Sequence, residues 1–87
     1  TWAIMLEAKY SSQSLKFLKK VDKELSKRLL VKIEKLQKEP FPQNMKRIEG
    51  QKLFRVRVGN YRILYEVDNG NNLLGVVKID KRERVYD

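Results

Sequence analysis

The chain has 87 residues, 41% hydrophobic and 36% charged, a balance typical of one globular domain with a modest core. It contains no cysteine and no histidine, which excludes disulfides, the usual zinc sites and nucleophilic triads built on either residue. A formal net charge of +9 favours polyanionic partners, either nucleic acid or an acidic protein.

Membrane and metal sites are not expected. No apolar run approaches the roughly 18 to 20 residues that cross a bilayer, and the first residues lack the pattern of a secretory signal. The acidic residues are scattered singly, without the paired carboxylates that hold magnesium. We therefore expect a single domain, residues 1–87, that is cytoplasmic and needs no metal or other cofactor.

The first elements predicted are a strand and a short helix. Residues 2–8 place Trp2, Ile4, Leu6 and Ala8 on one side of a strand. A helix is expected from about residue 13, with Ser11 or Ser12 as its N-cap and a break at residues 20–22.

A second, longer helix follows this break. Asp22 can cap it, and Pro40 and Pro42 stop it. One apolar stripe is formed by Leu25, Leu29, Leu30, Ile33 and Leu36. Lysine and arginine fill the remaining positions, which is typical of a solvated amphipathic helix pair that covers a sheet. A membrane-surface helix would carry bulkier apolar anchors.

A β-hairpin is predicted after the polar connector of residues 43–52. Two alternating runs at residues 53–67 flank Gly59-Asn60, as in a hairpin with a type II′ turn. In this register Arg57 lies opposite Arg62, and both share a face with Arg55. The other face is apolar and carries Phe54, Val56, Val58, Tyr61, Ile63, Tyr65 and Val67.

The three arginines form an unusual cluster, because like charges directly opposite each other destabilise a strand pair. Only Glu66 supplies a possible acidic neighbour in register on that face. A bound polyanion would relieve the repulsion. The alternative interpretation is a solvated outer face on which basic residues have accumulated.

A last strand is predicted at residues 73–79, a nearly continuous apolar run typical of a central strand. The order β-α-α-β-β-β predicts a two-layer α+β fold, with an antiparallel sheet and a helical hairpin packed on one face. The arginine face would then lie outward. The basic tail can bring Arg82 and Tyr86 toward it.

Two strings carry a resemblance to a known family. Residues 54–67, Phe-Arg-Val-Arg-Val-Gly-Asn-Tyr-Arg-Ile-Leu-Tyr-Glu-Val, and residues 81–86, Lys-Arg-Glu-Arg-Val-Tyr, resemble the RelE group of the RelE/ParE toxin superfamily. The element order resembles it along the whole chain. The first string is shared across the superfamily, whereas the tail favours RelE-like over ParE-like members.

The resemblance implies a toxin of a type II toxin-antitoxin system that enters the A site of the small ribosomal subunit and cleaves mRNA without a metal. In such toxins the 2′-hydroxyl attacks the adjacent phosphate. Arg62 would contact the scissile phosphate, Arg82 would clamp it and donate a proton, and Tyr86 would stack on a nucleotide. The catalytic set implied is Arg55, Arg57, Arg62, Arg82 and Tyr86, and the RNA-binding set is Arg55, Arg57, Arg62, Arg82, Arg84, Lys52 and Lys81.

The resemblance identifies a partner but leaves the general base open. Arg55 and Arg57 stand where the family often has lysines, one of which is thought to act as base, and arginine accepts protons poorly. Glu49 and Lys52 remain as candidate bases, or activity rests mostly on positioning and charge stabilisation. The partner implied is an acidic, RelB-like antitoxin that covers the arginine face.

Two other functions stay open. A ParE-type toxin would block DNA gyrase by binding and would need no catalytic residues. A nontoxic basic RNA-binding module would bind RNA with a steep salt dependence and cleave nothing.

Overall fold

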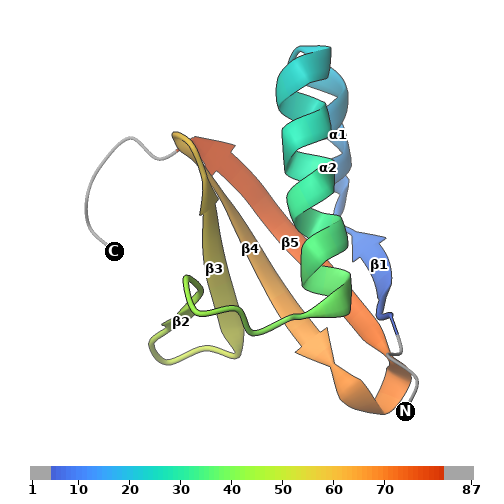
Figure 1. Ribbon diagram of the computed structural model, residues 1–87, viewed down its shortest axis with the longest axis vertical. Helices are drawn as coiled ribbons and strands as arrows, with labels where there is room; N and C mark the ends of the chain where they lie inside the picture. The colour runs from blue at the N-terminus through green and yellow to red at the C-terminus, as the bar shows by residue number, and fades with distance from the viewer. Residues whose placement is uncertain (1–4, 82–87) are drawn as a thin grey trace.

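Five strands in the order β1-β5-β4-β3-β2 form one mixed sheet in the computed structural model (Figure 1), which describes residues 5–81. β1 pairs with β5 in parallel, and the other neighbours are antiparallel. Along the chain the elements are β1 (Glu7–Tyr10), α1 (Ser12–Lys20), α2 (Lys23–Lys38), β2 (Lys46–Ile48), β3 (Leu53–Val58), β4 (Tyr61–Asp68), the 3₁₀ turn η1 (Asn69–Asn71) and β5 (Leu73–Lys81).

Both helices begin at the caps that the sequence offered. The Ser11 side chain accepts a hydrogen bond from the Ser14 amide, and Asp22 accepts one from the Leu25 amide at 2.8 Å. In α2 the buried stripe is Leu25, Leu29, Ile33 and Leu36. Leu30 was wrongly predicted to belong to it and is 43% exposed, because it follows Leu29 by about 100° around the helix.

The hairpin has the predicted register. Val58 pairs with Tyr61, Arg57 with Arg62, and Phe54 with Tyr65. Gly59 has a φ of +59°, whereas Asn60 is not among the described residues with positive φ, as a type II′ turn requires. The two apolar faces of helix and hairpin meet in a core that contains Leu29, Ile33, Leu36, Val56, Ile63, Tyr65, Leu74, Val76 and Ile79.

The two-layer α+β prediction is confirmed, with three corrections. The sheet is not wholly antiparallel, because the first strand, β1, joins the edge beside the last strand, β5, and runs parallel to it. The connector contains an additional edge strand, β2, whose three residues are too few to show periodicity. The strand predicted at residues 2–8 overlaps β1 only at residues 7 and 8, since residues 5 and 6 are not in a strand and residues 2–4 lie outside the described residues.

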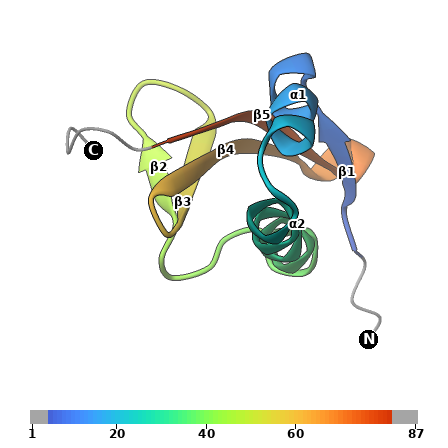
Figure 2. The same ribbon diagram turned by 90° about the horizontal axis from the view of Figure 1, so that it is seen from above.

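The two sides of the sheet are unequal. α2 crosses one face, and α1 lies along β5 where β1 ends (Figures 1 and 2). Figure 2, seen from above, shows no helix over the other side of β2 and β3. Within residues 5–81, no helix is both long and apolar enough to cross a membrane.

Candidate functional site

The side of the sheet turned away from α2, which we call the open face, carries two adjacent rows in which all residues but Leu64 are charged. The first row runs across three strands as Arg57, Arg62 and Asp80. The second row, one step further along the strands, is Lys46, Arg55, Leu64 and Lys78. Because cross-strand partners share a face, these rows bring together five cations and one carboxylate.

The three predicted arginines share this face but differ in exposure. Arg57 and Arg62 are partly buried, and 30% of the Arg62 side chain is accessible. Arg55 is only 3% exposed. Arg55 therefore shares the open face, as predicted, but it is buried there between Lys46 of β2 and Leu64 of β4, so the expectation that it is exposed is wrong.

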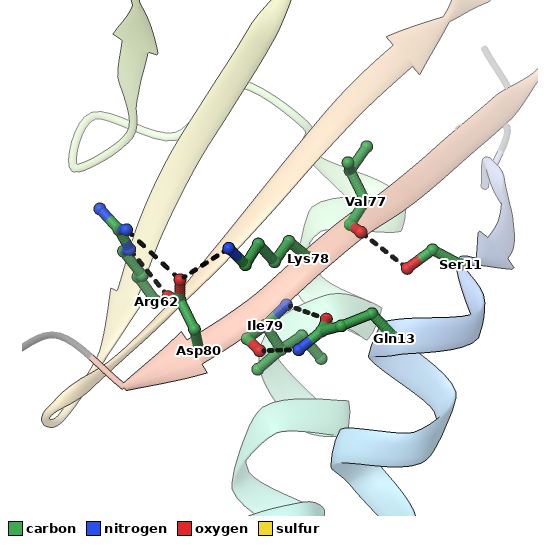
Figure 3. Close-up of polar contacts among 7 residues, drawn as sticks. All are labelled: Ser11, Gln13, Arg62, Val77, Lys78, Ile79 and Asp80. Carbon is green, nitrogen blue, oxygen red and sulfur yellow. Dashed lines mark hydrogen bonds and ion pairs between the residues drawn. The ribbon is translucent and has the colours of Figure 1, made fainter.

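Asp80 supplies the acidic neighbour that the hairpin itself lacks. Arg62 donates two hydrogen bonds to it, from Nε to Oδ1 at 2.8 Å and from Nη2 to Oδ2 at 3.3 Å (Figure 3). Lys78 Nζ lies 3.7 Å from Oδ2. Glu66, the only acidic neighbour considered from the sequence, is four residues from Arg62 along β4, or about 13 Å. The repulsion between Arg57 and Arg62 is thus offset partly from within the chain.

A β-bulge in β5 places Asp80 on this face. Tyr65 pairs with Val76, but Leu64 pairs with Lys78, so Val77 is an extra residue in β5. The extra residue reverses the alternation. Ile79 therefore turns into the core, where it is fully buried, while Lys78 and Asp80 turn to the open face.

The N-terminus of α1 holds the bulged segment beyond the end of β1. The Ser11 hydroxyl donates to the Val77 carbonyl at 2.6 Å, and the buried Ser14 hydroxyl donates to the Val76 carbonyl at 3.1 Å. Gln13 acts like a strand partner, because its Nε2 donates to the Ile79 carbonyl at 2.7 Å and its Oε1 accepts from the Ile79 amide at 3.0 Å (Figure 3). The residue before Asp80 is thereby fixed on both backbone groups.

The charge state of Arg62 follows from this arrangement. Its hydrogen bonds to Asp80 raise the pKa of Arg62 above the usual value, although burial acts in the opposite direction. Arg62 is therefore a permanent cation. It can bind a phosphate but cannot accept a proton.

Other predicted site residues lie elsewhere or outside the described chain. Glu49 and Lys52 are exposed in the turn between β2 and β3. Their turn adjoins Leu53, about 13 Å along β3 from Arg57. Lys81 pairs with Tyr61, which packs against the core under the helices, so Lys81 does not share the open face. Its side chain is exposed. Arg82, Arg84 and Tyr86 lie outside the described residues.

Sequence reasoning missed three residues of the open face, Asp80, Lys78 and Lys46. Lys46 lies on the open face because β2 pairs with β3. Lys78 and Asp80 lie there because of the bulge in β5. The alternation Lys78-Ile79-Asp80 at the end of the apolar run was the available signal. Among residues 5–81 no group of three or more acidic side chains could hold a metal ion.

Comparisons with known proteins were made for sequence and for structure. A family model described as the ParE toxin of the type II toxin-antitoxin system parDE matches residues 8–86. A comparison with curated proteins finds no match.

Solved structures similar to the chain include RelE toxins. In the archaeal RelE-RelB complex from Pyrococcus horikoshii, the matching chain has a TM-score of 0.81 and 28% identity, covering 93% of this chain and 99% of that one. The RelB-RelE complex from Methanococcus jannaschii gives 0.66 and 29%, covering 90% and 94%. The isolated E. coli RelE toxin gives 0.80 and 19%, covering 93% and 88%, a likeness of fold alone.

Proposed function

The chain belongs to the ParE toxin family of type II toxin-antitoxin systems, and from this premise we propose that it is a RelE-like endoribonuclease. It would act in the cytoplasm, enter the A site of the small ribosomal subunit and cleave mRNA there without a metal, thereby inhibiting translation. The observation that carries this proposal is the open face, where two rows bring five cations and one carboxylate onto one side of the sheet.

The geometry supports binding of an RNA backbone. Guanidinium groups bind phosphate oxygens with two parallel hydrogen bonds. The pair with Asp80 uses the edge of Arg62 that contains Nε. A phosphate that binds Arg62 would therefore lie beside the carboxylate of Asp80.

The proposed reaction needs a stabilised phosphate and two proton transfers. Arg62 would contact the scissile phosphate, and Arg57, its neighbour in the row, would balance the charge that develops there. By the resemblance to RelE toxins, Arg82 would clamp the phosphate and donate a proton, and Tyr86 would stack on a nucleotide. Arg55, Arg84, Lys52 and Lys81 would contribute at most to long-range attraction of RNA.

An acidic antitoxin is the proposed protein partner. Two of the similar solved structures are complexes of RelE with RelB. The cations of the open face outnumber its acidic groups, so an acidic partner would complement its charge. We propose that a RelB-like protein folds on the toxin and occludes Arg57 and Arg62.

Growth arrest on expression tests this proposal. Arg62→Ala removes the phosphate contact, while Lys78 still pairs with Asp80, so we expect arrest to be relieved while the protein remains folded. Lys27→Ala is the matched control, since Lys27 is an exposed cation on α2, and it should leave arrest unchanged. Undiminished arrest by a folded Arg62→Ala chain would contradict the proposal.

A second candidate is favoured by the name of the matching family model, ParE. A ParE-like toxin would inhibit DNA gyrase by binding, with no role for proton transfer. Purified chain that inhibits supercoiling and leaves ribosome-bound mRNA intact would establish this function in place of the first.

A further inference from the structure

The proposed reaction needs a general base, and the arginines of the open face cannot act as one. Attack by a 2′-hydroxyl requires a group that removes its proton. Arg55 and Arg57 stay protonated and cannot do so. A carboxylate can accept a proton at neutral pH.

We propose that Asp80 is the general base of the RNA cleavage, an inference that rests on the proposed function. Its carboxylate is bonded to Arg62 at 2.8 and 3.3 Å. A phosphate bound to Arg62 therefore lies next to this carboxylate. The 2′-hydroxyl that attacks this phosphate belongs to the same nucleotide and comes within reach of Asp80.

The alternatives considered from the sequence are less well placed. Glu49 belongs to the exposed turn between β2 and β3, about 13 Å along the sheet from the row of Arg57 and Arg62. Glu66 is on the open face, but its side chain lies against Gly75, with Cγ 2.9 Å from the position of an added Cβ. Asp80 is the carboxylate that shares a row with both arginines.

The carboxylate is held firmly and retains accepting capacity. The bulge and the two hydrogen bonds between Gln13 and Ile79 fix its backbone. The side chain is 23% accessible. Two carboxylate oxygens offer about four lone-pair sites, so the bonds from Arg62 leave room for the hydroxyl.

In the proposed step, Asp80 takes the proton of the 2′-hydroxyl as the 2′-oxygen forms a bond to phosphorus. The bond between phosphorus and the 5′-oxygen of the next nucleotide breaks, and that oxygen takes a proton from water. The products are a 2′,3′-cyclic phosphate and a 5′-hydroxyl. Asp80 then returns its proton to solvent.

The test compares single-turnover cleavage of ribosome-bound mRNA by wild type, Asp80→Asn and Asp80→Glu. Asparagine keeps the size of the side chain and can accept a bond from Arg62, but it cannot act as base. We expect kcat to fall about 10²- to 10⁴-fold in Asp80→Asn with KM little changed, and Asp80→Glu to retain part of the activity. Glu66→Gln is the matched control and should cleave like wild type.

The pH profile separates a base from a residue that only aligns Arg62. Charged groups facing Asp80 are Arg62 from β4, Lys78 from β5 and, further along the row, Arg57 from β3. Lysine and arginine do not titrate near neutrality. Wild-type kcat should be flat from about pH 6 to pH 8, whereas the rate of Asp80→Asn should rise about tenfold per pH unit, because hydroxide must replace the base.

Each outcome decides the inference. A wild-type kcat in Asp80→Asn, or a raised KM with a flat pH profile, overturns it. Thermal unfolding shows whether Asp80→Asn is folded. If it is not, Asp80→Ser is used for the same comparison. Loss of cleavage in Arg62→Ala with normal cleavage in Asp80→Asn refutes the base and leaves the proposed function standing, while an inactive wild type refutes both.

Discussion

Tyr65 has a fully buried ring and a hydroxyl that donates to the Pro40 carbonyl at 2.6 Å. This contact ties the segment just after α2 to the middle of β4. Burial raises the pKa of Tyr65 to about 12. In the unfolded chain a tyrosine ionises near pH 10, so the folded state retains a proton that the unfolded state loses.

The stability should therefore fall as the pH rises from about 10 to 12, and a shift of this size corresponds to about 2 to 3 kcal/mol. Tyr65→Phe should cost about 1 kcal/mol at pH 7 through the lost hydrogen bond and should reduce the alkaline slope. Urea unfolding of both proteins at several pH values measures this. Equal alkaline slopes would contradict the assignment.

At the scale of the element, α1 and β5 depend on each other. β1 pairs with β5 only as far as Val76, and Ser11, Gln13 and Ser14 then take over as hydrogen-bonding partners of the strand. The start of a helix thus stabilises a bulge that sets the orientation of Asp80. This coupling links the helical layer to the open face.

Gln13→Ala should reveal the coupling. It removes partners from both backbone groups of Ile79 and should destabilise the fold by about 1 to 3 kcal/mol. Cleavage should fall by more than the loss of folded protein explains, because Asp80 is no longer held. Lys16→Ala, an exposed change in the same helix, is the control. Wild-type stability and activity in Gln13→Ala would show that the bulge needs no such support.

The accuracy of sequence reasoning also varied by element. The hairpin register was predictable residue by residue, because Gly59-Asn60 fixes the turn and Arg57 must then face Arg62. The helix caps were predictable from Ser11 and Asp22. The bulge at Val77 was not, since it depends on side chains of α1 distant in sequence. Asp80 was therefore missed, although the basic residues around it were expected.

At the scale of the whole molecule, positive charge is not confined to the open face. Lys27, Arg28, Lys32 and Lys35 of α2 line a hollow beside the hairpin turn, and Arg57 of the open face lines it from β3. Either surface could attract RNA from a distance. Only the open face combines its cations with a carboxylate in the same row.

Salt dependence can show which surface binds. In ribosome-binding titrations, Lys46→Ala should weaken affinity and reduce the slope of log K against log salt by about 0.7 to 0.9, because Lys46 belongs to the open face. Lys27→Ala should leave that slope unchanged. The reverse pattern would place RNA on α2 and contradict the assignment of the open face.

The most direct measurement maps the 5′ ends of an mRNA after purified wild-type or Arg62→Ala chain is added to ribosomes programmed with it. Wild type should produce a new end within the codon at the A site, only when ribosomes are present, and Arg62→Ala should produce none. An mRNA left intact by folded wild-type chain, or cut equally by Arg62→Ala, would contradict cleavage by the open face.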